Sequence, residues 1–343
     1  MSSLPYSFDE SSIRDILTHW LEINSVTPNE KDYLEHLELC FTQLGYQTAR
    51  QNVSENRWNL LATRNNPNPK LLYSTHVDTV PPFLPVRFED NTLYGRGACD
   101  TKGGLLAMML AAERIQSDDI GFLLVVGEEV DHIGAKTSED LDIKPEQIIL
   151  CEPTVNRVVN AQKGMIKLIC SAQGVAAHSA YPARGDSAVH HLVDMLHDLL
   201  HEPSWPTNDT LGPTTINVGL LEGGVAANVF APSAEATLLF RTVAPTKDYE
   251  PIIERIAQKH GVNAHIYVEN DPVFFSTPEL EDINLCTVAF NTDATYLSTI
   301  APIWLVGPGD IEVAHTDHEH INLDELQQGI DLYEKLGKHA LEK

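Results

Sequence analysis

Histidine and carboxylate residues follow three short apolar segments of the sequence, at the point where each segment ends. They are His76 and Asp78 in LLYSTHVD, Glu128 and Glu129 in GFLLVVGEE, and Glu152 in QIILCEP. Imidazole and carboxylate ligands without a thiolate suit zinc, cobalt or manganese, and they fit metal-assisted hydrolysis better than a structural zinc site. The pattern therefore predicts a metal centre that supports hydrolysis.

Glu128 and Glu129 are consecutive carboxylates directly after a fully apolar segment. Keeping both ionised there costs repulsion and desolvation unless a cation neutralises them. Because neighbouring side chains diverge, one of the two can bind metal while the other takes a proton from a water molecule. The alternative is a pair of solvated charges at a strand end.

Asp100 and His315 extend the candidate metal site. Asp100 follows the turn GRGAC and precedes TKGG, a predicted helix start, where an aspartate can also be a simple N-cap. His315 lies in AHTDHEH, a loop with two further histidines before the last predicted helix. Asp78 is placed to accept the free N–H of a ligating His76, because alternate residues of a strand point the same way.

The three apolar segments, 71–78, 121–129 and 147–153, predict central strands of a sheet, because continuous apolar runs between helices are typical of buried parallel strands. In such sheets ligands bind outside the carboxyl ends of the strands. Helical spacing of apolar residues begins at Ile13, and a second helix is expected over 31–44, ending at Gly45. We therefore expect an α/β domain with a mainly parallel central sheet.

The pattern changes between residues 163 and 269. The expected elements are a strand (163–171), a helix (186–201), two strands (214–220 and 234–243), a helix (247–260) and a strand (262–269). This β-α-β-β-α-β order is ferredoxin-like. Sheet-like runs and an amphipathic helix return after residue 271, so we expect a discontinuous domain of residues 1–162 and 271–343 with an inserted domain of residues 163–270.

Composition excludes several classes of function. The net charge of −26, from 23 basic and 49 acidic residues, would repel nucleic acid and anionic membranes. The start, MSSLPYSFDE, does not resemble a signal peptide, and no apolar run could span a bilayer, so a cytoplasmic protein is expected. Five widely spaced cysteines without a CxxC pair predict neither a disulfide framework nor a thiolate metal site.

Taken together and in this order, the motifs resemble the zinc aminoacylases and exopeptidases that include acetylornithine deacetylase, succinyl-diaminopimelate desuccinylase and the glutamate-type carboxypeptidases. The resemblance covers nearly the whole chain. It implies a zinc-exopeptidase-like catalytic domain with an inserted lid and dimerisation domain. Glu152, where the aminopeptidase branch has an aspartate, is similar to the acylase and carboxypeptidase branch.

The resemblance implies a ligand set for two zinc ions per subunit, with cobalt as a substitute: His76, Asp100, Glu129, Glu152 and His315. Asp100 would bridge the ions, and Asp78 would orient His76. Glu128 would be the general base.

The inserted segment carries further implied residues. His178, in HSAYP, resembles a lid histidine that reaches the active site of the partner subunit and stabilises a tetrahedral oxyanion, which implies a homodimer. Asn228 and Arg241 resemble residues that hold a substrate carboxylate, for which a guanidinium is well suited. Without the resemblance, His178 is a loop histidine and Arg241 an ion-paired surface residue. Asp293 resembles a family position near the site, without an assigned role.

The leading functional hypothesis is hydrolysis of the acyl amide of an N-acetyl amino acid such as N-acetylornithine, by water between two metals with Glu128 as base. That reaction would make the protein a deacetylase of amino-acid, and specifically arginine, biosynthesis. Desuccinylation of an N-succinyl amino acid and dipeptidase or carboxypeptidase activity are alternatives on the same scaffold. A catalytically inactive metal-binding dimer is the alternative from another class.

Overall fold

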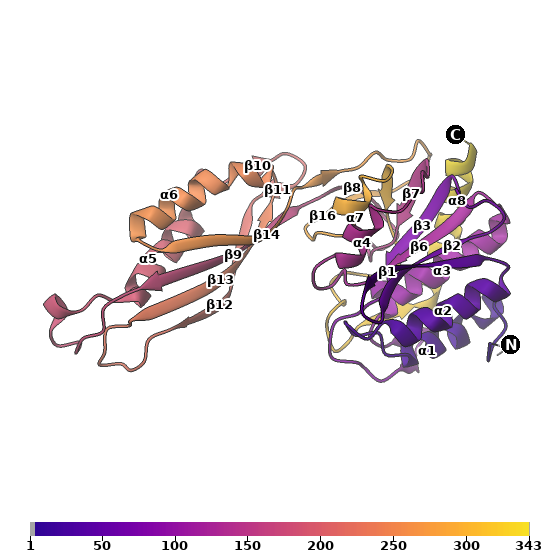
Figure 1. Ribbon diagram of the computed structural model, residues 1–343. Helices are drawn as coiled ribbons and strands as arrows, with labels where there is room; N and C mark the ends of the chain where they lie inside the picture. The colour runs from indigo at the N-terminus through magenta and orange to yellow at the C-terminus, as the bar shows by residue number, and fades with distance from the viewer. Residues whose placement is uncertain (1–3, 343) are drawn as a thin grey trace. The chain divides into compact units, whose positions relative to one another are not determined.

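A computed structural model describes residues 4–342 of the chain. The chain divides into two compact units (Figure 1). The first unit runs to Asn160 and takes in Phe275–Cys286 and the part of the chain from Thr292 onward. The second unit contains Ala161–Phe274 and the short segment Thr287–Asn291.

The largest sheet among the described residues has nine strands in the order β1-β2-β6-β3-β7-β17-β8-β15, with β16 beside β8. Its strands are β1 (Gln47–Ser54), β2 (Arg57–Thr63), β3 (Leu71–His76), β6 (Ile120–Val125), β7 (Gln147–Leu150), β8 (Val158–Gln162), β15 (Val273–Phe274), β16 (Leu285–Val288) and β17 (Ile303–Leu305). The four strands β6, β3, β7 and β17 are parallel. Every residue of β3, β6 and β7 is buried, as their apolar sequences require.

The predicted α/β class is confirmed, but the sheet is mixed. Strands β1, β2 and β8 run antiparallel to their neighbours. The antiparallel edge arises because β1 and β2 form a hairpin that joins the sheet beside β6. The mainly parallel arrangement that the sequence predicts is found at the centre of the sheet, which is the part that ends at the candidate site.

Six helices are described in the first unit: α1 (Ile13–Glu22), α2 (Lys31–Gln43), α3 (Gly103–Ile115), α4 (Ile133–Ser138), α7 (Ala294–Leu297) and α8 (Leu323–Glu342). Gly45 follows α2 with φ 82°, the left-handed conformation that suits a helix end. A small antiparallel sheet of β4 (Arg87–Glu89), β5 (Thr92–Tyr94) and β18 (His320–Asn322) precedes α8. No helix within residues 4–342 is long and apolar enough to cross a membrane.

The second unit has the predicted ferredoxin-like order. Its elements are β9 (Gly164–Gln173), α5 (Ala188–His201), β12 (Thr215–Gly223), β13 (Ser233–Thr242), α6 (Glu250–His260) and β14 (Asn263–Asn270), with a small hairpin of β10 (Thr207–Asn208) and β11 (Gly212–Pro213). The sheet order is β12-β13-β9-β14. Alternate residues of β9 and β13, such as Leu168 and Phe240, form one buried core with α5 and α6. Strand β12 is an edge strand of this sheet.

Candidate metal centre

The three strands that carry the predicted site residues are neighbours in the sheet. Strand β3 lies between β6 and β7, and all three run parallel. His76 ends β3 opposite Val125, the last residue of β6, and Ser74 lies opposite Leu150, the last residue of β7. The residues that follow these strand ends therefore meet at one edge of the sheet, as the sequence predicted.

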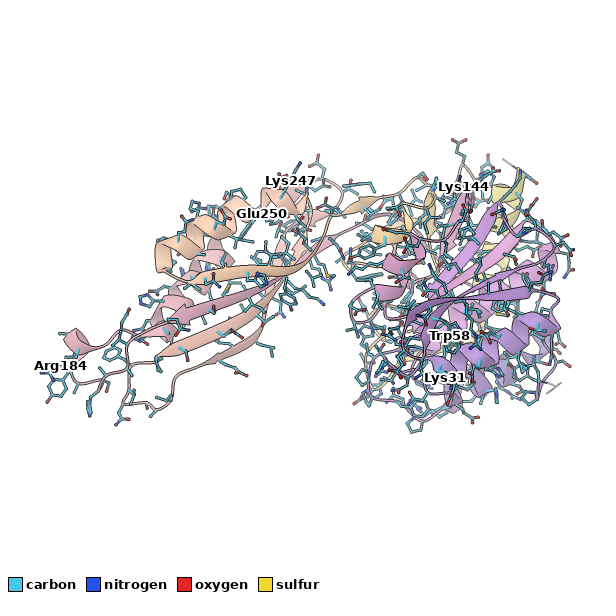
Figure 2. All side chains as sticks on the ribbon, viewed as in Figure 1. Lys31, Trp58, Lys144, Arg184, Lys247 and Glu250 are labelled. Carbon is cyan, nitrogen blue, oxygen red and sulfur yellow. The ribbon has the colours of Figure 1, made fainter. Side chains whose placement is uncertain are left out.

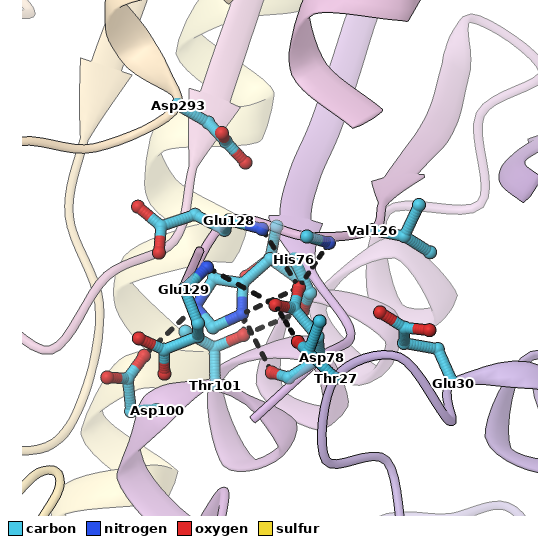
Figure 3. A network of polar contacts seen from close by, with 12 residues as sticks. Thr27, Glu30, His76, Asp78, Asp100, Thr101, Val126, Glu128, Glu129 and Asp293 are labelled. Carbon is cyan, nitrogen blue, oxygen red and sulfur yellow. Dashed lines mark hydrogen bonds and ion pairs between the residues drawn. The ribbon is translucent and has the colours of Figure 1, made fainter. Parts of the chain in front are cut away.

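Asp100 lies between two histidines. Its Oδ1 is 3.0 Å from Nε2 of His76, and its Oδ2 is 3.2 Å from Nε2 of His315. The same nitrogen of His315 lies 3.0 Å from Oε1 of Glu129. One potential ligand atom from each of His76, Asp100 and Glu129 falls within 4.8 Å of the others (Figure 3). The two oxygens of one buried carboxylate thus face two different imidazoles.

Asp100 does not cap a helix, which was the simple alternative for this position. Helix α3 begins at Gly103, and Lys102 is its N-cap residue. The buried carboxylate of Glu319 holds the turn before Asp100, because it accepts hydrogen bonds from the backbone N–H groups of Gly97 (2.8 Å) and Asp100 (3.4 Å). Arg96 pairs with Glu319 at 2.5 Å. A buried ion pair therefore fixes the backbone from which Asp100 projects.

Asp78 has a broader structural role than the predicted orientation of His76. Nδ1 of His76 lies 2.9 Å from the backbone carbonyl of Asp78 but 3.7 Å from its carboxylate. That carboxylate instead accepts hydrogen bonds from the backbone N–H groups of Gly127 (2.8 Å), Glu128 (3.1 Å) and Glu129 (3.2 Å) (Figure 3). Asp78 therefore contacts His76 through its backbone and shapes the turn of the paired glutamates through its side chain.

Negative charge in this centre exceeds the positive charge that the chain supplies. Burial, and after it the charge of Glu152, raise the pKa of Glu128 well above the ordinary glutamate value. Burial also raises the pKa of Glu152, with Asp100 adding to the effect and His76 opposing it. Oε1 of Glu152 is buried and has no hydrogen-bond partner in the described part of the chain. An unpartnered buried carboxylate oxygen among other carboxylates fits a site for cations.

Contacts with histidines lower the pKa of a neighbouring carboxyl group, whereas burial raises it. Burial tends to raise the pKa of Asp100, but hydrogen bonds with His315 and His76 hold it well below its ordinary value. Hydrogen bonds to Asp100 and Glu129 raise the pKa of His315 to about 10. In the metal-free chain these imidazoles therefore supply part of the positive charge that the carboxylates require.

Residues 72–339 match the Peptidase family M20/M25/M40. The chain belongs to this family. A Peptidase M20 domain-containing protein of Schizosaccharomyces pombe is 32% identical over 333 residues, which cover 94% of this chain and 83% of the relative. A probable carboxypeptidase of Aspergillus terreus is 36% identical, with 84% of this chain and 75% of the relative covered.

Solved structures agree with the M20 assignment at the level of the fold. A tripeptidase from Staphylococcus aureus aligns with a TM-score of 0.80 at 22% identity, covering 97% of this chain and 99% of that chain. An M20 family metallo-carboxypeptidase from Sulfolobus solfataricus aligns with a TM-score of 0.72 at 18% identity, covering 97% and 99%. Family membership makes the chain a metal-dependent hydrolase that acts on carbon–nitrogen bonds.

The other predicted residues of this M20 chain lie in its second unit. His178 is exposed, and its Nδ1 accepts a hydrogen bond of 3.1 Å from the backbone N–H of Ala180. A β-bridge joins His178 to Val229, so Asn228 lies beside the His178 segment. Arg241 is the second-last residue of β13, opposite Thr215 and Met165.

Asn228 and Arg241 lie at opposite ends of the second unit. Asn228 lies in the loop between β12 and β13, at the Ser233 end of β13, whereas Arg241 is near the other end of that strand. The strand extends over about 27 Å from Ser233 to Arg241. In Figure 2, Arg184, which is six residues after His178 in the sequence, lies at one end of the second unit, away from Lys247, which follows β13. Within one chain, the two residues cannot hold the same carboxylate.

One cluster beside the M20 centre was missed by the sequence analysis. Glu128, His132 and Asp293 each place a potential ligand atom within 4.8 Å of the others. Nδ1 of His132 lies 2.9 Å from Oδ1 of Asp293 and 3.6 Å from Oε1 of Glu128. The available signals were a histidine four residues after Glu128 and an aspartate without a role, but nothing in their spacing indicated that they meet.

Proposed function

We propose that this M20 chain is a peptidase of carboxypeptidase or dipeptidase type, which removes a residue from a short peptide with a free C-terminal carboxylate. The geometry of Asp100 carries the proposal for the site, because its two oxygens face His76 and His315 separately. Relatives named as probable carboxypeptidases support the substrate class.

The proposed metal ligands are the five residues identified from the sequence: His76, Asp100, Glu129, Glu152 and His315. Asp100 would be shared between two ions, His76 and Glu152 would complete one site, and Glu129 and His315 the other. Zinc fits a donor set of imidazoles and carboxylates. When bound, such ions act as Lewis acids toward a carbonyl group and make water a better nucleophile.

Glu128 is the proposed general base. Its backbone N–H donates to Asp78, which fixes the turn, and its side chain is largely buried beside the other carboxylates. A carboxyl group with a raised pKa can both accept and release a proton near neutral pH. Glu128 would take the proton of the attacking water and return it to the leaving amine of the peptide bond.

The second unit would complete the site by dimerisation. Because Asn228 and Arg241 lie at opposite ends of one unit, a carboxylate held by both needs one residue from each of two subunits. His178, beside Asn228, would enter the active site of the partner subunit with it, and would stabilise the oxyanion. The edge strand β12 supports dimerisation by pairing with the β12 strand of a second subunit, since its Leu220 and Leu221 are 65% and 57% exposed.

N-Acetylornithine, the leading substrate expected from the sequence, is not favoured by a specific observation. The relatives reported above carry the names of peptidases and carboxypeptidases. They give no support for a deacetylase, for a role in arginine biosynthesis or for cobalt as the bound ion. The alternative on the same scaffold, cleavage of short peptides, is therefore the function proposed here.

A substrate panel on zinc-loaded protein tests the proposal. The panel contains dipeptides and tripeptides, the same peptides with amidated C-termini, N-acetylornithine and an N-succinyl amino acid. We expect cleavage of the free peptides and loss of cleavage on amidation, because the carboxylate is part of what the site binds. Turnover of N-acetylornithine alone would refute the peptidase assignment, and no turnover at all would favour a metal-binding protein without activity.

Glu128→Gln tests the mechanism on the same substrates. The amide keeps the size of the side chain but cannot accept the proton, so kcat should fall by about 10³-fold or more while the metal content stays at two ions. The exposed Glu235→Gln is the matched control. Undiminished activity of Glu128→Gln would show that another group is the base.

A further inference from the structure

We propose that His132, held in place by Asp293, is a positioning residue for the carboxylate of Glu128. The inference rests on the proposed role of Glu128 as general base, and it adds two residues to the machinery of that site. Both residues lie in the first unit, as Glu128 does.

The backbone of Glu128 is fixed, but its carboxylate is not. The Glu128 N–H donates to Asp78 at 3.1 Å, and those of the flanking residues do the same. In the part of the chain that the structure describes, the one close polar contact recorded for the Glu128 carboxylate is Nδ1 of His132, at 3.6 Å. The position of the carboxylate therefore depends on His132 more than on any hydrogen bond.

His132 is itself held from several sides. Its backbone N–H donates to the carbonyl of Gly127 at 2.8 Å, which closes the turn that carries Glu128. Its ring is buried, packs 5.5 Å from the ring of Tyr296, and places Nδ1 2.9 Å from Oδ1 of Asp293. The same nitrogen thus lies between two carboxylates, one at hydrogen-bond distance and one just beyond it. A ring fixed by Asp293 presents its N–H edge to Glu128.

Asp293 is suited to fix the ring because it is rigid and buried. It is 1% exposed and starts helix α7, where its backbone carbonyl accepts from the N–H groups of Tyr296 (3.0 Å) and Leu297 (2.9 Å). Within residues 4–342, its second oxygen, Oδ2, has no hydrogen-bond partner. Among the same residues His132 is therefore the hydrogen-bond partner of the Asp293 side chain, whose charge would otherwise be unsatisfied.

Substitution of a positioning residue and substitution of a metal ligand should have different effects on kcat and on metal content. A base must lie within hydrogen-bond reach of the water proton, and a displacement of about 1 Å can cost about 100-fold in rate. Loss of His132 should therefore lower kcat and leave KM and metal content nearly unchanged. Loss of a ligand would lower the metal content as well.

The backbone at His132 dictates the variants. Its φ of 56° lies in the left-handed region, which glycine and asparagine tolerate. His132→Gly removes the ring without backbone strain. His132→Asn places an amide N–H close to where Nδ1 lies. Gln116→Gly, at φ 54° at the end of α3, is the matched control for a glycine introduced at a left-handed position remote from the cluster.

The experiment measures kcat, KM and zinc content of these variants, of Asp293→Ala and of the His132→Gly/Asp293→Ala double variant. We expect His132→Gly to lose about 10- to 100-fold in kcat with two zinc ions retained, and His132→Asn to recover most of it. The double variant should lose no more than His132→Gly alone, because Asp293 acts through the ring.

The outcomes separate this inference from the proposed function. If Glu128→Gln is inactive while His132→Gly keeps full kcat, Glu128 remains the base and the positioning role is refuted. If His132→Gly loses zinc, or if His132→Asn is as slow as His132→Gly, His132 acts as a ligand or as packing and the inference is also overturned. If Glu128→Gln keeps its activity, the proposed mechanism fails first.

Discussion

The metal centre of the first unit and the His178 segment of the second both carry candidate histidines, but their surroundings differ. In the metal centre, His76 and Asp100 are buried and each contacts other charged groups at 3.0–3.2 Å. His178 is exposed, and its recorded side-chain hydrogen bond is to a backbone N–H two residues away. Folding of one chain therefore assembles the first region, whereas the role proposed for His178 would require a contact from outside its own unit.

The difference also has an energetic side. Buried carboxylates in the centre repel one another, so an ion that neutralises them binds the folded chain and not the unfolded one. Such binding adds RT ln(1 + [L]/Kd) to stability, or about 4 kcal/mol at a thousandfold excess over Kd. The exposed His178 segment has no comparable charge to neutralise. Ions should therefore stabilise the first unit, and variants of His178 should not alter that effect.

The largest expected effect follows removal of a buried ligand. Glu152→Ala should lose at least one bound ion and about 10³-fold or more in kcat/KM, because both the positive charge and the position of the substrate carbonyl depend on the ion. Zinc content by elemental analysis and kcat/KM check this together. The His178→Ala variant is the contrast, since it should keep both ions. Full zinc content in Glu152→Ala would remove Glu152 from the ligand set.

The second effect, about 10²- to 10³-fold in kcat, is expected for His178→Ala, since an oxyanion donor is lost while the ions stay. Mixing His178→Ala with Glu128→Gln sharpens the contrast between the regions. Each mixed dimer has one site with an intact Glu128 and the partner's intact His178, so a 1:1 mixture should recover about a quarter of native activity after subunit exchange. If no activity returns, His178 does not act across subunits.

The parts of these regions that the sequence predicts are those that depend on the pattern of apolar residues and on the order of helices and strands. The ends of the three parallel strands were predictable, because buried parallel strands are continuous apolar runs and their carboxyl ends meet. The ferredoxin-like order was readable from the change of period between residues 163 and 269. The antiparallel hairpin at the sheet edge was not, because Gln47–Ser54 is mostly exposed and lacks an apolar run.

Contacts between residues distant in sequence were beyond these patterns. Asp293 meets His132 across 161 positions of the sequence, through a short helix whose placement no periodicity specifies. Asp78 is only two residues after His76 in the sequence, yet its carboxylate accepts from backbone N–H groups about 50 residues later, because the turn after β6 folds over it. Likewise, the separation of Asn228 and Arg241 follows only once the bounds of β13 are known, because Asn228 lies in the loop before this strand and Arg241 near its end.

A third effect concerns dimerisation through the edge strand β12 of the second unit. We expect its influence on activity to be smaller than that of His178→Ala, because it can be offset by a higher protein concentration. A Leu220→Asp/Leu221→Asp double variant should weaken pairing along β12, since two charges replace exposed apolar side chains on an edge strand. Sedimentation should show more monomer, and specific activity should rise with protein concentration. Leu200→Asp, a 48% exposed leucine of α5, is the control. Dimers of unchanged stability would place the interface elsewhere.

The smallest expected effect is a pH dependence of the stability of the chelated protein. Burial raises the pKa of Glu128 and of Glu152 above the ordinary value of 4.5. Such a group binds its proton more tightly in the folded chain, so its contribution to stability is complete below about pH 4.5 and is lost as the pH rises through the raised pKa. After chelation, Tm should therefore be a few degrees higher at pH 6 than at pH 8. Zinc-loaded protein should show the reverse order, because ion binding requires deprotonated carboxylates.

Glu128→Gln should flatten the pH dependence of Tm in the chelated protein, whereas His178→Ala should leave it unchanged. An equal slope in Glu128→Gln and the native chain would mean that the buried carboxylates do not carry the effect.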